Sequence, residues 1–466
     1  MTQFTPSPGE TRIHSSDLVQ LKSYLMTSLI NDIGSKISES DQYRAALENA
    51  LQNLYNQLNL QLPNHIRLQL FQEIVNELAG FGPIQPLLED PTISEVMVNG
   101  AEKVFIERNG EIFEAGISFD DADHLLRVIN RMIHPLGRRV DADNPTVDAR
   151  LPDGSRVNAV IPPVAVDGPY LTIRKFLKNK MTMNELVKLG SLTPHMVEFL
   201  QACVAARLNI LISGGTSSGK TTMLNILSGM IPGQERIVTI EDAVELQLKQ
   251  RHVVRLETKS PNTDGGGEVT TRDLVRNALR MRPDRIVVGE VRGGEAMDML
   301  QAMNTGHSGS ITTLHANSPR DAIARLETLA MMAGLDMPLL PIRRQIDAAL
   351  NLIVHQTRLQ DGTRKTTHIT EVGGMEGDVV TLSDIYKFEQ TGISADGKIT
   401  GELRATGIRP LFTPRLEVVG FKLRGEIFGA ARSGKSRYWH GFSHEYFPKP
   451  PPRAFLEYSA EALLHL

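Results

Sequence analysis

One short segment near the middle of the chain constrains the fold more than any other. It runs from Gly214 to Thr221 and follows the pattern G-x-x-x-x-G-K-T. An apolar run, residues 208–213, comes before it, and a helical pattern of apolar residues follows it. Strand, glycine-rich loop and helix in this order create a loop whose backbone N–H groups face anionic oxygens at the positive end of the helix dipole. The segment therefore predicts a phosphate-binding loop, or P-loop, in an α/β domain.

The residue types of this loop suit a nucleotide bound together with Mg²⁺. Glycines let the backbone wrap around the phosphates. Lys220 places a charge against the β- and γ-phosphates, and the Thr221 hydroxyl ligates magnesium. We predict ATP and Mg²⁺ as cofactors. The nucleotide-binding residues would be Gly214, Gly215, Thr216, Ser217, Ser218, Gly219, Lys220, Thr221 and Thr222.

The same pattern occurs a second time, from Gly429 to Ser436. A weak apolar run comes before this copy, no helical pattern follows it, and three consecutive prolines lie at 450–452. We interpret it as a coincidence.

Acidic residues follow two other apolar runs, as hydrolysis of ATP requires. Residues 285–289 lead into Glu290, and residues 237–240 lead into Glu241 and Asp242. In a parallel sheet the carboxyl ends of the strands share one edge, so these acids can converge on the nucleotide. A solvated loop carboxylate is the alternative for either acid taken alone.

Histidines and arginines supply further candidates. His307 and His315 flank the strand-like residues 310–314, where a histidine could contact the γ-phosphate or simply add polarity to a loop. Arg272, Arg276 and Arg280 share a helix face, which is either solvated or an intersubunit contact. Arg150, Arg156 and Arg174 are candidates for the same intersubunit role.

Patterning predicts the fold class: an α/β P-loop ATPase domain of RecA type, preceded by a small α+β domain and an N-terminal helical module. We place a disordered start and helices at 1–63, the α+β domain at 64–178, the ATPase domain at 179–425 and a tail at 426–466. Asn99-Gly100 and Asn109-Gly110 predict hairpins in the second of these.

Composition excludes several classes. A net charge of -4 without a Lys/Arg block argues against a nucleic-acid partner. The single cysteine, Cys203, can form neither an intrachain disulfide nor a cysteine zinc site. No apolar stretch approaches the about 18 residues of a membrane span, and residues 1–16 are not a secretory signal. We expect a cytoplasmic protein that reaches a membrane through partners.

From about residue 65 to 425 the chain resembles the secretion ATPases of type II and type IV secretion and type IV pilus machines. Glu241 resembles that family's aspartate-box acid, Glu290 its atypical Walker B acid, and residues 305–317 its histidine box. The runs at 81–88, 95–100, 148–159, 272–284 and 369–378 resemble the CpaF type, also called TadA type, which assembles tight-adherence (Flp) pili.

This resemblance implies a homohexameric ring at the cytoplasmic face of the inner membrane that pushes on pilus platform proteins. It implies that Lys220 and Thr221 bind phosphate and magnesium, that Glu290 activates water and that Glu241 supports the metal. It further implies that His315 senses the γ-phosphate and that Arg174 reaches the nucleotide. The four-cysteine zinc motif that is usual in the type II secretion and pilus-extension ATPases of the family is missing, because the chain has one cysteine.

Three functions stay open from the sequence. The first is a motor for pilus extension, with retraction also open. The second is a type IV secretion ATPase that exports substrates or DNA. The third is a nucleotide-gated scaffold with little turnover.

Overall fold

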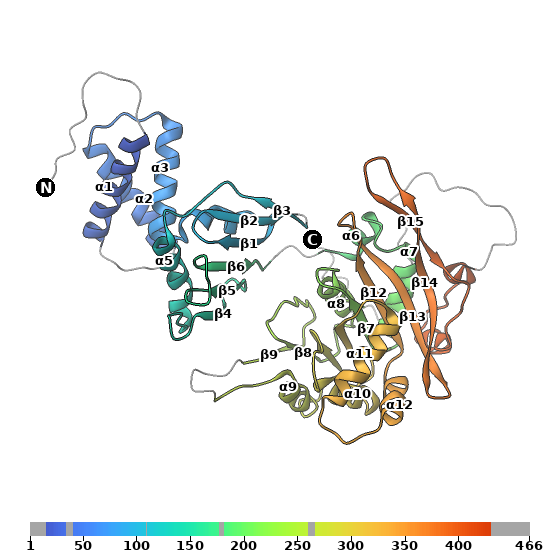
Figure 1. Ribbon diagram of the computed structural model, residues 1–466. Helices are drawn as coiled ribbons and strands as arrows, with labels where there is room; N and C mark the ends of the chain where they lie inside the picture. The colour runs from blue at the N-terminus through green and yellow to red at the C-terminus, as the bar shows by residue number, and fades with distance from the viewer. Residues whose placement is uncertain (1–14, 34–40, 109, 177–180, 260–265, 430–466) are drawn as a thin grey trace. The chain divides into compact units, whose positions relative to one another are not determined.

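The computed structural model describes residues 15–33, 41–108, 110–176, 181–259 and 266–429. These residues form two compact units, Met1–Lys178 and Asn179–Leu466 (Figure 1). In the part of the chain described, no helix is both long and apolar enough to cross a bilayer.

The first unit begins with three helices, α1 (Ser15–Ile33), α2 (Asp41–Gln57) and α3 (Asn64–Ala79). They share one apolar core, in which Leu25 and Leu51 pack against Ile74. The predicted boundary after residue 63 is therefore wrong for this core, because α3 buries its apolar face against the helical module. The predicted disordered start lies outside the described residues.

A six-stranded antiparallel sheet completes the first unit. Its order is β3-β2-β1-β6-β5-β4, and the helix α5 (Ala122–Ile133) packs on one face. The strands are β1 (Ile93–Asn99), β2 (Lys103–Arg108), β3 (Glu111–Glu114), β4 (Thr146–Arg150), β5 (Arg156–Val160) and β6 (Tyr170–Arg174); α4 (Gln85–Glu89) precedes them. β1 and β2 form the hairpin predicted at Asn99-Gly100, and β2 pairs with β3 as predicted at 109–110, where residue 109 itself is not described.

The second unit is built around a nine-stranded mixed sheet with the order β15-β14-β13-β12-β7-β11-β10-β8-β9. The six strands from β12 to β9 are parallel, and β13, β14 and β15 add an antiparallel meander. The strands are β7 (Ile210–Gly214), β8 (Ile237–Glu241), β9 (Val253–Glu257), β10 (Arg285–Val288), β11 (Ile311–His315), β12 (Leu352–Arg358), β13 (Arg364–Glu376), β14 (Val379–Ile393) and β15 (Ile399–Ala405).

Helices cover both faces of this sheet (Figure 1). Alternate residues of the parallel strands belong to opposite cores. Ile210 and Ile212 of β7 face the core under α7 and α8, while Leu211 faces the core under α9 to α12. The helices are α6 (Met183–Lys188), α7 (Pro194–Ala205), α8 (Lys220–Gly229), α9 (Thr271–Ala278), α10 (Glu295–Asn304), α11 (Pro319–Met331), α12 (Leu339–Ala349) and α13 (Thr413–Val418). Burial on both faces explains why these strands are short continuous apolar runs. The predicted fold class is confirmed.

One detail of the second unit differs from the sequence interpretation. Ile427 and Phe428 are buried beside Phe199, so the core extends past the predicted end at 425. Residues 430–436 of the second P-loop-like pattern lie outside the described residues. Cys203 is fully buried, as expected for a core residue, and burial raises the pKa of its thiol.

Candidate functional site

The P-loop leaves the carboxyl end of β7, the strand hydrogen-bonded between β11 and β12. At its first residue a Cβ would collide with the Gln356 carbonyl oxygen and the Ser218 hydroxyl, so only glycine fits at Gly214. Further along, Ser217 and Gly219 have φ angles of +54° and +98°. The glycines predicted to let the loop wrap are thus required by close approach at one position and by a left-handed backbone at another.

Lys220 opens helix α8 and folds back over the loop. Its Nζ donates to the Gly215 carbonyl at 2.8 Å, and the Ser218 hydroxyl donates to the same oxygen at 2.9 Å. Burial lowers the pKa of Lys220, and the nearby Glu290 works in the opposite direction. An anionic ligand would favour the charged ammonium in the same way as Glu290 does. Lys220 is therefore placed at the mouth of the loop, close to the acid predicted to act with it.

A hydrogen-bonded chain joins the P-loop to Glu290. His315 ends β11, and its two ring nitrogens contact the Glu290 carboxylate at 2.8 Å and the Thr216 hydroxyl at 3.0 Å. Because an ionised carboxylate only accepts, Nδ1 carries a proton and donates to Glu290, and the direction of the bond between Nε2 and the Thr216 hydroxyl depends on whether Nε2 carries a proton as well. The structure therefore brings together three predicted site residues that are far apart in sequence.

Arg292 holds the other oxygen of Glu290. Its Nε donates to Glu290 Oε2 at 2.9 Å, and its Nη1 donates to Asp242 Oδ2 at 2.7 Å. Burial raises the pKa of Glu290, but the hydrogen bonds from His315 and Arg292 outweigh burial and lower it overall. Glu290 is accordingly an ionised carboxylate, held between a histidine and an arginine.

Glu241 is the last residue of β8 and is almost fully buried. Its Oε2 accepts backbone N–H bonds from Glu245 at 2.7 Å and Leu246 at 2.9 Å. It also packs on the Gly289 backbone next to Glu290, since a Cβ at Gly289 would lie 3.2 Å from its Cγ. Glu241 thus shapes the loop after β8, and the following residue, Asp242, is the one that reaches Arg292.

The predicted magnesium ligands are Thr221, Glu241 and Glu290. Of the residues described, no group of three or more His, Cys, Asp or Glu side chains is arranged to hold a metal. Thr221 is exposed in the first turn of α8. Magnesium in nucleotide sites takes most of its oxygens from phosphates and water, with one or two protein ligands. The residues present therefore fit Mg²⁺ that arrives with a nucleotide, and they do not form a metal cage of their own.

Arg174 lies in the first unit, at the end of β6. Its Nε donates to Glu95 Oε1 at 2.6 Å. The predicted reach of Arg174 to the nucleotide stays a prediction.

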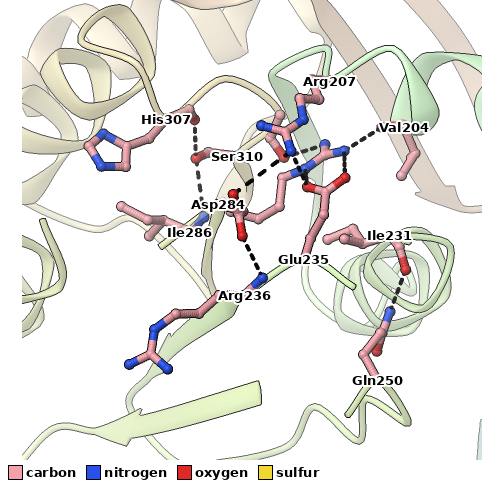
Figure 2. Close-up of polar contacts among 12 residues, drawn as sticks. Val204, Arg207, Ile231, Glu235, Arg236, Gln250, Asp284, Ile286, His307 and Ser310 are labelled. Carbon is pink, nitrogen blue, oxygen red and sulfur yellow. Dashed lines mark hydrogen bonds and ion pairs between the residues drawn. The ribbon is translucent and has the colours of Figure 1, made fainter. Parts of the chain in front are cut away.

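Three of the other arginine candidates, and His307, have contacts elsewhere in the second unit. Arg272 and Arg276 both donate to the Asp298 carboxylate at 2.8 Å, and Arg280, just after α9, donates through Nη1 to the Arg276 carbonyl at 2.9 Å, so the intersubunit role predicted for these arginines stays a prediction. His307 precedes β11 at the amino edge of the sheet, where its carbonyl accepts from Ser310 (Figure 2). Of the two histidines, only His315 belongs to the site.

Three further residues lie against the loop. Arg292, two positions after Glu290, could have been noticed as a cation beside the acid. Arg364 donates through Nε to the Ser217 carbonyl at 2.8 Å, and buried His355 contacts the Ser213 hydroxyl at 2.8 Å through Nδ1. No local pattern marks either of these two, because they come from β13 and β12, whose place beside β7 is a property of the tertiary fold.

Comparison with known proteins identifies the family. The family described as "Type II/IV secretion system protein" matches residues 77–390, and the chain belongs to it.

Individual relatives are named for conjugal transfer and for type IV secretion. A Mycobacterium tuberculosis protein named for conjugal transfer is 39% identical over 313 residues, which are 66% of this chain and 88% of that protein. The VirB11 protein of a Brucella suis type IV secretion system is 33% identical over 318 residues, covering 62% of this chain and 88% of that protein. The crystal structure of the B. suis VirB11 ATPase in complex with sulphate covers 62% of this chain and 95% of its own, with 31% identity and a TM-score of 0.35.

Proposed function

We propose that this chain binds ATP with Mg²⁺ at residues 214–222 and hydrolyses it to drive a membrane-associated secretion or pilus machine. The observation that carries this proposal is the chain of contacts from Thr216 through His315 to Glu290. It links the phosphate-binding loop to an ionised carboxylate at the adjacent strand ends. Such an arrangement can couple the presence of a γ-phosphate to the position of a general base.

In this proposal each side chain has a separate task. Lys220 neutralises the β- and γ-phosphates, and Thr221 holds the magnesium that comes with the nucleotide. Bound Mg²⁺ would supply charge neutralisation of the phosphate oxygens. Glu290 orients the attacking water and accepts its proton. His315, protonated on Nε2, exchanges its Thr216 contact for a hydrogen bond that it donates to the γ-phosphate, and Glu241 fixes the loop that carries Asp242.

The proposed assembly is a homohexamer at the cytoplasmic face of the inner membrane. Arg174, from the first unit, would complete a nucleotide site within the ring. Platform proteins in the membrane would receive the work, and no direct nucleic-acid contact is expected. Light scattering of the full chain with and without ATP tests the ring, and a monomer under both conditions would contradict catalysis between subunits.

Two machines are candidates for the work. The CpaF-type sequence runs favour assembly of tight-adherence pili. The names of relatives in conjugal transfer and type IV secretion favour export of a substrate instead. Deletion of the gene separates the two: loss of surface pili supports the first, and unchanged pili with loss of export supports the second.

Substitution Glu290→Gln tests hydrolysis directly. The amide keeps the shape of the side chain but cannot accept a proton, so phosphate release should fall by about 10²- to 10⁴-fold. Binding of ATP should be retained, whereas Lys220→Ala should abolish it. Exposed Glu268→Gln serves as the matched control and should leave turnover unchanged.

An unchanged rate in Glu290→Gln would refute the assignment of the base. Tight ATP binding with negligible turnover in the wild-type chain would support the third alternative, a nucleotide-gated scaffold.

A further inference from the structure

The hairpin formed by β12 and β13 stands directly beside the P-loop. β12 pairs in parallel with β7 as far as Gln356 opposite Gly214, and then continues to Arg358. β13 starts at Arg364, which pairs with Arg358. The strand order places this hairpin on the side of β7 opposite to β11 and β10, which carry His315 and lead into Glu290. The P-loop therefore has the β12–β13 hairpin on one side and β11 and β10 on the other, and only the second side holds the proposed catalytic groups.

Arg364 is the hairpin residue that reaches the loop. Its Nε donates to the carbonyl oxygen of Ser217 at 2.8 Å, and its Cδ lies 3.8 Å from where a Cβ at Gly219 would be. Ser217 is exposed and has a φ of +54°, an unfavourable backbone conformation for a residue other than glycine. In a trans peptide the C=O and the following N–H point in opposite directions. By holding the Ser217 carbonyl outward, Arg364 sets the direction of the Ser218 N–H.

The hairpin that presents Arg364 is held on two sides. At its turn the Asp361 carboxylate accepts from Thr363 N at 3.0 Å and, through its other oxygen, from Ile399 N of β15 at 2.7 Å. On the other side Lys365 Nζ donates to the Gly190 carbonyl at 2.8 Å, and the Ser191 hydroxyl donates to the Arg364 carbonyl. A guanidinium supported in this way can impose a conformation on the loop instead of following it.

We propose that Arg364 is a positioning residue for the nucleotide. Arg364 acts through the Ser217 carbonyl and keeps the peptide between Ser217 and Ser218, the crest of the P-loop, in its phosphate-binding conformation. The proposal rests on the proposed function, since it concerns the same nucleotide. A loop that is already ordered loses less conformational entropy when it binds. The crest N–H groups face phosphates that ADP and ATP share, so both nucleotides benefit equally. The hydrolytic step is unaffected, because it uses His315 and Glu290 on the side of β11 and β10.

The chain offers a sharp test, because the Nε2 of glutamine follows Cδ as the Nε of arginine does. Arg364→Gln keeps an N–H donor at that place and removes the charge, whereas Arg364→Ala removes both. Arg404→Ala is the matched control, since this exposed arginine of β15 contacts the Glu402 and Glu389 carboxylates instead of the P-loop or the supports of the hairpin turn. For each full-length variant, the Kd for ADP and for ATP is measured together with kcat and KM for ATP hydrolysis.

We expect Arg364→Ala to raise both Kd values and KM by about tenfold, the cost of one charge-assisted hydrogen bond, while kcat is unchanged. Arg364→Gln should recover most of the affinity, and Arg404→Ala should behave as wild type.

Unchanged Kd values in Arg364→Ala would overturn the proposal. So would an effect on ATP alone, or an Arg364→Gln variant as weak as Arg364→Ala, since the charge would then act on the nucleotide directly. A wild-type chain that binds neither nucleotide would instead refute the proposed function.

Discussion

The parallel strands of the nine-stranded sheet have an arginine–glutamate pair at their amino ends (the amino edge) and another at their carboxyl ends (the carboxyl edge). The two pairs differ in burial. At the amino edge, Arg285 pairs with Glu235, and the two side chains are 0% and 9% exposed. At the carboxyl edge, Arg292 pairs with Glu290, with 63% and 16% exposed. The same chemistry therefore occurs once in the protein interior and once at an open site.

The amino-edge pair is fully enclosed by partners. Arg285 donates to Glu235 at 2.7 and 3.2 Å, to the Val204 carbonyl at 2.9 Å and to the Gly309 carbonyl at 3.1 Å. Figure 2 shows Arg207 reaching Glu235 and Asp284 from the same edge. These contacts join the end of α7 to the segments that lead into β8, β10 and β11. A buried pair of this kind is fixed, because loss of either partner leaves an unpaired charge.

The carboxyl-edge pair shares its partners, and its arginine is exposed while Glu290 is half-buried. Arg292 divides its donors between Glu290 and Asp242, and Glu290 divides its oxygens between Arg292 and His315. Exposed ion pairs contribute little to stability and exchange partners at small cost. The comparison teaches that burial, and not the residue types, separates a structural pair from one whose partners are shared and can exchange.

Arg285→Met gives the largest expected effect. It removes the buried cation but leaves Glu235 buried, and we expect a loss of about 3–5 kcal/mol of unfolding free energy. Thermal and denaturant unfolding of the full chain measure the change. Arg207→Ala, which removes the exposed partner of the same glutamate, is the control and should cost far less. Equal losses of unfolding free energy in both variants would contradict the argument that burial makes Arg285 matter more than Arg207.

His355 extends the comparison to pH, because it is a buried titratable group next to the open site. Burial, with a smaller contribution from His368, lowers the pKa of His355 from 6.5 to about 4. In the unfolded chain this histidine takes up a proton below about 6.5, and in the folded chain only below about 4. The free energy of unfolding should therefore fall as the pH drops through this window, by up to about 3 kcal/mol from this group.

The check is the pH dependence of unfolding in His355→Gln, which should be flatter between pH 6.5 and 4 than in wild type. His195→Gln, at an exposed position of α7, is the control. A wild-type slope in His355→Gln would contradict the burial argument.

Arg292→Ala gives the smallest expected effect and acts on the exposed pair. Arg292 lowers the pKa of Glu290, so its removal raises that pKa. The base is then protonated at a higher pH, and the acid limb of the hydrolysis profile should shift upward in pH. We expect little change in thermal stability. A large loss of stability with an unmoved pH profile would show that the carboxyl-edge pair is structural after all.

Sequence reasoning reached much of the site because its strongest signals are local. The P-loop is defined by the order of strand, loop and helix, and the acids 241 and 290 each follow an apolar run that could be recognised by itself. His315 and His307 could not be separated in this way, since both flank one strand. Only the direction of β11 in the sheet places one beside the loop and the other at the opposite edge.

The sequence alone determined the P-loop, the acids expected beside it and the α/β class, because each depends on residues adjacent in the chain. The tertiary structure alone decided which distant groups surround the loop. β12 lies between β7 and β13, and this order brings Arg364 to Ser217 and His355 to Ser213. It likewise decided that α3 packs with the helical module and that Arg285 is buried. Strand order and burial arise from long-range packing that no short pattern encodes, so the feature first seen as one loop is completed by side chains from five strands or strand ends, those of β8, β10, β11, β12 and β13.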